Sequence, residues 1–181
     1  MNETIRIRPV KPEDAKQHVR LGLLVWRNAY KHIFPEEVFI EKENRAEDKI
    51  KNFDKNNIND KLTLSYVAEI NGRIVGFVFG RMTSHYQYFG EKGYADLEAI
   101  YIHPDYQGLG IGNKFKQIFI DWLKSNGGTK FVIGVLKENH KARKVYEKWG
   151  GKLNAHSQPF VKLGVGYDEV FYTFDITEKE Q

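Results

Sequence analysis

Three glycines, Gly108, Gly110 and Gly112, fall at alternate positions between an apolar stretch and an amphipathic one. Glycine has no Cβ and leaves backbone N–H groups uncovered, and the start of a helix adds unpaired N–H groups and the positive end of the helix dipole. A phosphate group can approach such a backbone closely. The stretch therefore predicts an anion site, most simply for a pyrophosphate. A loop that only turns the chain is the alternative interpretation.

Two familiar phosphate-binding motifs do not fit this stretch. A P-loop, G-x-x-x-x-G-K-[ST], counted from Gly108 would need glycine at Asn113 and a hydroxyl residue at Phe115. The dinucleotide motif G-x-G-x-x-G would also need glycine at Asn113. That motif opens a βαβ unit, whereas a predicted hairpin precedes this site. The anion site must therefore be of another kind.

A third motif does fit. The Q-x-x-G-x-G spacing of residues 107–112 resembles the Q/R-x-x-G-x-G/A signature of the GNAT superfamily of acetyl-CoA-dependent N-acetyltransferases. The stretch "LEAIYIHPDYQGLGIG" is similar to the family's fourth strand and the loop after it, and "VLKENHKARKVYEKWGGKL" is similar to the family's next motif block. The order of predicted elements is also similar. The resemblance covers nearly the whole chain and is most specific in residues 95–153.

The resemblance implies acetyl-CoA as co-substrate, bound where the fourth and fifth strands, residues 94–102 and 130–136, splay apart. The pantetheine arm would lie in this gap and pair with backbone groups of Ile100 and Ile102, where an amide would also polarise the thioester carbonyl. Asn139 would reach the pantetheine. The pyrophosphate would be held by the amides of the glycine loop, which are those of Gln107, Gly108, Leu109, Gly110, Ile111, Gly112 and Asn113.

Amide formation from a thioester and an amine requires removal of a proton from the amine, stabilisation of the oxyanion and an acid for the leaving thiolate. Tyr146 lies where the family often has its general acid, although it shares a helical stripe with Val145 and Trp149 and is also a core candidate. Family members often carry a carboxylate base on the fourth strand. Glu98 is our candidate, acting directly or through water, and an ion-paired acid is the alternative. Asp96 points to the same face unless a bulge intervenes.

The acceptor site would be walled by the end of the first helix and the loop before the fourth strand. Trp26, Tyr30 and Tyr86 supply aromatic rings that could hold an amine by cation–π contact. Trp26 and Tyr30 also lie on the apolar stripe of the first helix, which leaves a core role equally open. The sequence does not select among a polyamine, an aminoglycoside, an amino acid, a protein N-terminus and a lysine side chain.

Composition limits the partners and the location. The 181 residues include no cysteine, and the histidines show no ligand spacing, so we expect no metal site, no disulfide and no thiolate nucleophile. The net charge is +4, but acidic and basic residues are mixed along the chain, which argues against a nucleic-acid-binding domain. Apolar runs are too short to span a bilayer and the N-terminus does not resemble a signal peptide, so we expect a cytoplasmic protein with no membrane partner.

Hydrophobic periodicity predicts the elements that must position these residues. The predicted elements, in chain order, are a strand at 4–10, a helix from Pro12 to about His32, one or two exposed helices within 36–56, a hairpin around Asn71-Gly72, a loop at 82–94, a strand at 94–102, a helix over 115–123, a strand at 130–136, a helix over 142–149 and strands near 152–161 and 167–176. Because hairpins and crossovers are interleaved, we expect one α/β domain, residues 1–181. The resemblance implies a GNAT-like mixed, mostly antiparallel central sheet, splayed between strands four and five, with flanking helices.

The leading hypothesis is an N-acetyltransferase that moves the acetyl group of acetyl-CoA to a primary amine of a small molecule or peptide by direct attack in a ternary complex. A non-catalytic acetyl-CoA-binding sensor or interaction module is the alternative, because the glycine loop reports on binding alone. Pairing through the C-terminal strands is common in similar proteins, which makes a homodimer a further expectation.

Overall fold

The computed structural model describes residues 4–56 and 59–177, so the expected unit 1–181 extends beyond the described part at both ends. A seven-stranded sheet forms its centre, with the strand order β1-β2-β3-β4-β5-β7-β6. Neighbouring strands are antiparallel except for β4 and β5, which confirms the expected mixed, mostly antiparallel sheet. The strands are β1 (Arg6–Pro9), β2 (Thr63–Ile70), β3 (Arg73–Arg81), β4 (Ala95–Ile102), β5 (Lys130–Leu136), β6 (Lys152–Lys162) and β7 (Val165–Asp175).

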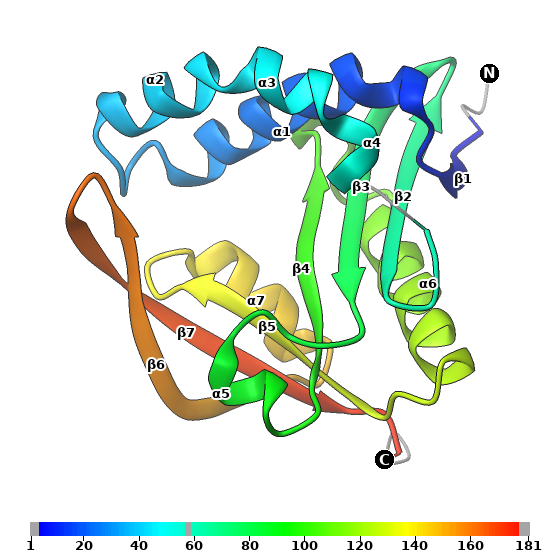
Figure 1. The fold of residues 1–181 in the computed structure, drawn as a ribbon, viewed down its shortest axis with the longest axis vertical. Coiled ribbons are helices and arrows are strands. Elements are labelled where there is room, and N and C mark those ends of the chain that lie inside the picture. The colour runs from blue at the N-terminus through cyan, green and yellow to red at the C-terminus, as the bar shows by residue number, and fades with distance from the viewer. Residues whose placement is uncertain (1–3, 57–58, 178–181) are drawn as a thin grey trace.

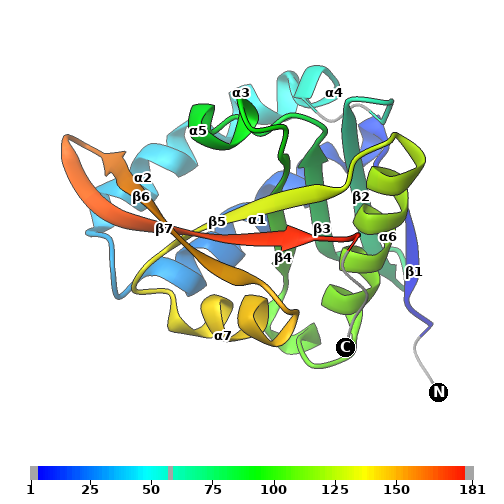
Figure 2. The same cartoon turned by 90° about the horizontal axis from the view of Figure 1, so that it is seen from below.

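Helices cover both faces of this sheet. Figure 2 shows α6 and α7 on one side of the sheet and α2, α3 and α4 on the other. None of the helices in the described ranges is long and apolar enough to cross a membrane. The helices are α1 (Ala15–Tyr30), α2 (Glu36–Asn44), α3 (Ala46–Lys51), α4 (Phe53–Asn56), α5 (Gln87–Gly90), α6 (Ile111–Ser125) and α7 (His140–Lys148).

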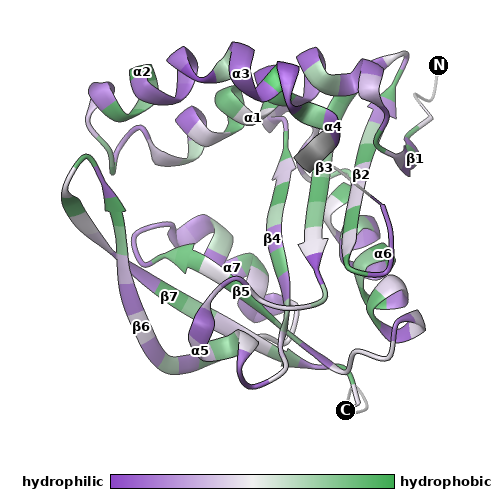
Figure 3. Ribbon diagram, viewed as in Figure 1, coloured by the Kyte–Doolittle hydropathy of each residue, from purple (hydrophilic) through white to green (hydrophobic). Residues whose placement is uncertain are grey.

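The core is split between the two faces of the sheet. Phe115, Phe119 and Leu123 recur every four residues along α6 and are fully buried against one face, as the sequence periodicity predicted. Leu21 and Val25 of α1 pack against the opposite face. Because both faces of β3 are covered, its residues are buried from Ile74 to Gly80. Figure 3 shows the resulting hydrophobic centre, with hydrophilic residues on the outer helices α2 and α3.

The strands β4 and β5 pair at their beginnings and then part. Their pairing is limited to Ala95 with Phe131 and Asp96 with Val132. From there β5 continues along β7 and β4 continues along β3, and the two halves of the sheet diverge (Figure 1). Within the described residues, no strand pairs with the β5-facing edge of β4 beyond Asp96. The expected splay between strands four and five is confirmed.

The hairpin between β2 and β3 forms as predicted, because Asn71 (φ 50°) and Gly72 (φ 77°) adopt the left-handed conformations of a two-residue turn. Other predicted boundaries shift by a few residues. The first helix ends at Tyr30 rather than near His32, and β1 is shorter than residues 4–10. The loop at 82–94 contains the short helix α5.

The segment 36–56 differs more from its prediction. It forms three short helices rather than one or two, and they are not simply exposed. Val38 and Phe39 are buried in a cluster with Trp26, and Phe53 is buried against α1. Each of these helices is too short for a buried stripe to be recognised from the periodicity of the sequence.

A histidine on the inner side of α1 makes this fold sensitive to acid. The His18 ring stacks on Phe77 with centroids 3.8 Å apart and contacts Phe53 edge-on, and burial lowers the pKa of His18 to about 4. The unfolded chain therefore takes up a proton below about pH 6.5 that the folded protein binds only near pH 4. The free energy of unfolding should thus fall as the pH falls through this window, by up to about 3 kcal/mol.

We predict that His18→Phe, which retains a ring but cannot titrate, has a shallower loss of stability over this pH range. Urea unfolding of both proteins at several pH values between about 7 and 4.5 measures the slopes. His32→Phe, at an exposed position just after α1, is the matched control and should keep the wild-type slope. Equal slopes for wild type and His18→Phe would show that the pKa of His18 is the same in the folded and the unfolded protein, against this prediction.

Candidate functional site

The glycine loop lies between the end of β4 and the first turn of α6. Gly108 (φ 82°) and Gly110 (φ 79°) adopt the left-handed conformation, which accounts for a glycine at each of these positions. Gly112 does not, and a Cβ there would meet Ile102 at 3.5 Å and Trp149 at 3.6 Å, which is ordinary van der Waals contact. The fold itself therefore requires two of the three glycines. The backbone conformation does not account for the third, Gly112.

The first turn of α6 has the features of an anion site. By helix geometry, the amides of Ile111, Gly112 and Asn113 have no carbonyl partner within the helix. The N-cap residue is Gly110, which offers no side chain to cap them, and the first turn contains no acidic residue. The positive end of the helix dipole is therefore left available to a negatively charged ligand. Leu109, within the loop, is exposed.

Side chains from three elements hold this loop in place. Gln107 donates from Nε2 to the Ile102 carbonyl (3.1 Å), and its Oε1 accepts from Lys141 on α7 (2.6 Å). Asn113 accepts from the indole of Trp149 (2.9 Å). The predicted cofactor residues at the end of β4 and the start of α6 are thus brought together with α7.

Asn139 is the N-cap of α7, and its side chain accepts from the Ala142 amide (3.2 Å) and lies close to the Tyr30 phenol. That proximity brings the predicted acceptor wall next to a predicted cofactor residue. Tyr146, on the same helix, is 9% exposed and packs in the core cluster beside α6, so its ring has the core role that the sequence allowed. Burial raises the pKa of the Tyr146 phenol well above its ordinary value. The hydroxyl therefore keeps its proton at neutral pH and can donate it.

A bulge on β4 decides which side of the sheet its side chains face. Ala95, Leu97, Ile100 and Ile102 all contact the core cluster beneath α6, which strict alternation along a strand would not allow. The register between β3 and β4 shifts in this region, where Phe79 pairs with Ala99 and Arg81 with Asp96. The carboxylates of Asp96 and Glu98 therefore lie together on one side of the strand, while Ile100 and Ile102 face α6.

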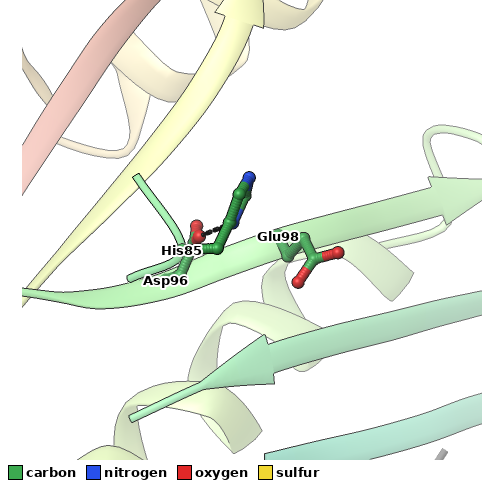
Figure 4. A group of neighbouring side chains, drawn as sticks. All are labelled: His85, Asp96 and Glu98. Carbon is green, nitrogen blue, oxygen red and sulfur yellow. Dashed lines mark hydrogen bonds and ion pairs between the residues drawn. The ribbon is translucent and has the colours of Figure 1, made fainter. Parts of the chain in front are cut away.

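Figure 4 shows that Asp96 meets His85, whereas Glu98 extends along the strand. Asp96 is fully buried, and its Oδ2 lies 2.5 Å from His85 Nδ1. Burial raises the pKa of Asp96, and the bond to His85 opposes that shift. The same bond raises the pKa of His85, against the effect of its partial burial. Glu98 accepts from Arg81 Nε at 2.5 Å, so the ion-paired alternative for this carboxylate is realised in the structure.

A pocket of about 300 Å³ opens beside this cluster, between the segment preceding α5 and the hairpin of β6 and β7. The Tyr86 hydroxyl donates to Glu169 Oε1 (2.9 Å), and Gln158 Nε2 donates to Glu169 Oε2 (3.2 Å). Glu169 is 5% exposed, and burial raises the pKa of its carboxyl group. The pocket is lined by His85, Tyr86, Gln87, Gln158, Pro159, Phe160, Val161 and Glu169.

The sequence identified some of these residues and missed others. Tyr86 lines the pocket, whereas Trp26 is buried and its ring is already covered by Lys42 Nζ at 4.1 Å. Glu169 and Gln158 carried no signal, because they approach Tyr86 and His85 only through the folding of the β6–β7 hairpin. His85 was visible in the loop before β4, but nothing in the sequence connected it to Asp96.

The ligand atoms of His85, Asp96 and Glu98 lie within 4.8 Å of one another, which is a spacing that a metal ion could bridge. His85 Nδ1 and Asp96 Oδ2 are already bound to each other, and Glu98 Oε2 is bound to Arg81. These contacts favour a hydrogen-bonded cluster over a cation site.

Comparison with known proteins gives consistent results. Residues 23–151 match the model of the acetyltransferase (GNAT) family. The chain is 27% identical over 117 residues to the L-amino acid N-acyltransferase MnaT of Escherichia coli (strain K12). This match covers 64% of this chain and 66% of that protein. The chain is 34% identical over 107 residues to an acetyltransferase of Yersinia pestis (strain Pestoides F), which covers 59% of this chain and 67% of that protein. The chain thus spans about two thirds of the length of these relatives.

Solved structures share the fold. PaiA N-acetyltransferase from Thermoplasma acidophilum, in complex with coenzyme A, has a TM-score of 0.72 at 17% identity over 95% of this chain and 99% of that chain. YncA from Salmonella typhimurium, with its cofactor acetyl-CoA, has a TM-score of 0.64 at 18% identity over 98% of this chain and 97% of that chain. The family model covers the splayed strands, the glycine loop and α7, and it confirms the resemblance of their sequence motifs. This chain belongs to the GNAT family of acetyltransferases.

Proposed function

We propose that the protein transfers the acetyl group of acetyl-CoA to a primary amine by direct attack within a ternary complex. The observation that carries this proposal is the unpaired edge of β4, which runs directly into the uncapped first turn of α6. A ligand with an extended arm that ends in a pyrophosphate could pair with this strand edge and place its phosphates at the start of the helix. The two solved neighbours bound to coenzyme A and acetyl-CoA support the same ligand.

Acetyl-CoA would lie along β4. The pyrophosphate accepts from the amides of the glycine loop, most directly those of Ile111, Gly112 and Asn113. The pantetheine arm pairs with backbone groups of Ile100 and Ile102 and so occupies the position of a missing strand. Asn139, at the start of α7, closes the other side of the arm. The thioester then lies beside the bulge of β4, near Tyr146 on one side and the carboxylates of β4 on the other.

The reaction forms a C–N bond and breaks the C–S bond of the thioester. The amine nitrogen attacks the carbonyl carbon, and a backbone amide of β4 stabilises the oxyanion. As the intermediate collapses, the thiolate of CoA takes the phenolic proton of Tyr146, which burial keeps bound at neutral pH. The attacking nitrogen loses one proton. We assign the binding and deprotonation of this nitrogen to the carboxylate of Glu98, on the acceptor side of β4, acting directly or through water.

The acceptor would enter from the side of the β6–β7 hairpin, where the pocket opens. Tyr86 lines that pocket, and Tyr30 reaches Asn139 from α1, so both rings lie on the path between the pocket and the cofactor residues. Trp26 stands behind Tyr30, with their ring centroids 5.0 Å apart. In this proposal the acceptor contacts the rings of Tyr30 and Tyr86, and Trp26 packs behind Tyr30.

Two measurements test this function. Calorimetry should detect binding of CoA, and thiol release should accompany acetylation of at least one amine in a panel of benzylamine, ethanolamine, putrescine, L-lysine and L-glutamate. Ligand at about 100 times its dissociation constant should add roughly 2.7 kcal/mol to the free energy of unfolding. Binding of CoA with no acetylation of any amine would instead support the non-catalytic sensor.

We predict that Gly112→Val weakens CoA binding at least tenfold while the free energy of unfolding changes by less than about 1 kcal/mol. A Cβ at this position would make only ordinary van der Waals contacts, so we expect the added side chain to obstruct the ligand at the neighbouring amides more than it disturbs the fold. Gly22→Ala is the control, because a Cβ there would meet Phe77 at a similar 3.5 Å on a helix away from the loop. A large loss of stability with unchanged CoA affinity would assign Gly112 to the fold alone.

We predict that Tyr146→Phe lowers kcat by at least about tenfold and leaves acetyl-CoA affinity nearly unchanged. The substitution removes one hydroxyl group and retains the ring that packs beside Trp149 and Tyr172. Steady-state kinetics with the best amine, together with a urea unfolding midpoint, separates the two roles of this residue. An unaltered kcat would leave Tyr146 as a core residue, with water or the bound amine as the proton source.

A further inference from the structure

The side chain of His85 is partly exposed to solvent, and it is also held by a bond to the protein interior. Its side chain is 46% exposed at the edge of the acceptor pocket, yet its Nδ1 lies 2.5 Å from the carboxylate of fully buried Asp96. Its ring also lies 3.9 Å from that of Tyr86, between centroids. One ring nitrogen is thus anchored on the buried Asp96 carboxylate (Figure 4), while the ring lines the pocket where an acceptor would enter.

Asp96 depends on His85 for much of its stabilisation. Its Oδ2 accepts from the Ser84 hydroxyl at 3.3 Å and lies against His85 Nδ1. Its Oδ1 is buried and has no hydrogen-bond partner among the residues that the structure describes. A buried carboxylate that lacks a donor on one oxygen is costly for the fold, and such groups concentrate at functional sites.

We propose that His85 is the general base that takes the proton of the acceptor amine, with Asp96 as the positioning residue that orients its ring. This assignment rests on the proposed acetyl transfer. Because only the tautomer with hydrogen on Nδ1 can donate to a carboxylate, Nε2 of the neutral ring carries the lone pair. The amine proton moves to Nε2 as the C–N bond forms, and the imidazolium is stabilised by Asp96. Since the ring is half-exposed, the proton then leaves to solvent after product release.

The charged groups that surround His85 affect its pKa. Asp96 and Glu98 approach from β4, Glu169 from β7 and Arg81 from β3, and Tyr86 is the next residue in the chain. The bond to Asp96 is the largest influence and raises the pKa of His85 above 6.5, whereas burial and Arg81 lower it. A base with a pKa somewhat above that of free imidazole suits proton removal from an amine near neutral pH.

Glu98 is less suited to be the final proton acceptor. Its Oε2 is held by the Arg81 guanidinium at 2.5 Å, and a proton would have to compete with that charge. With His85 as the base, the role assigned to Glu98 narrows to binding and orienting the acceptor amine beside His85. The two residues then act in sequence on the same nitrogen.

Chemical rescue tests this assignment. With the best amine of the panel, His85→Ala should lower kcat by about 10² or more, in the range expected for loss of a general base. Added imidazole should restore part of the rate, and methylated imidazoles of higher pKa should restore more where they fit. His32→Ala, at an exposed position outside the site, should keep the wild-type rate and gain nothing from imidazole. Glu98→Gln should act mainly by raising KM for the amine.

A second measurement does not require turnover. A nuclear magnetic resonance titration of the His85 ring should show a pKa above 6.5 in the wild type and a lower pKa in Asp96→Asn. The acidic limb of the kcat profile should move in the same direction in that variant. Incubation with EDTA should leave the rate unchanged, and loss of activity on chelation would overturn the proposal in favour of a metal at the same three residues.

The outcomes separate the two levels of proposal. Wild-type turnover together with an undiminished rate in His85→Ala would reject His85 as the base and leave the acetyltransferase function intact. A loss of rate in His85→Ala that no imidazole restores, with a His85 pKa unchanged in Asp96→Asn, would reduce the pair to a structural contact. CoA binding without acetylation of any amine would contradict both the proposed function and this assignment.

Discussion

The parting of β4 from β5 after two paired residues is the constraint on which the rest of the structure depends. An unpaired strand edge inside a sheet leaves backbone donors and acceptors without partners, which a folded protein tolerates only with compensation elsewhere. Here the compensation is a core on both sides of the opening. Phe115 and Phe119 fix β3 and β4 from α6, and Phe131 stacks on Phe174 with centroids 4.4 Å apart to fix β5 to β7.

The opening also sorts the site into two sides. Because β4 carries a bulge, its later residues Ile100 and Ile102 face α6 and the proposed cofactor side, while Asp96 and Glu98 gather on the proposed acceptor side. A regular strand would have placed all four side chains on one face. In the proposed reaction, the bulge would let a single strand supply backbone contacts to one substrate and carboxylates to the other.

Burial acts on the two sides in complementary ways. On the side of α7 burial raises the pKa of Tyr146, so the phenol is fully protonated at neutral pH. On the acceptor side burial raises the pKa of Asp96, and the bond to His85 works against that shift while raising the pKa of the imidazole. The tertiary structure thus keeps the Tyr146 phenol protonated by burial, and it favours the protonated form of His85 through the bond to Asp96.

The sequence by itself determined the features that depend on neighbouring residues. The hairpin at Asn71-Gly72, the buried stripe of α6 and the glycine loop were all predicted, because turn conformations, helical periodicity and an uncapped helix start are local properties. The family was visible for the same reason, since the cofactor site is built mainly from the backbone of one contiguous stretch. Only the tertiary structure decided which residues come together around the pocket on the proposed acceptor side. The bonds from His85 to Asp96 and from Tyr86 to Glu169 join residues 11 and 83 positions apart, and such contacts follow from how strands pair and helices pack rather than from any pattern along the chain.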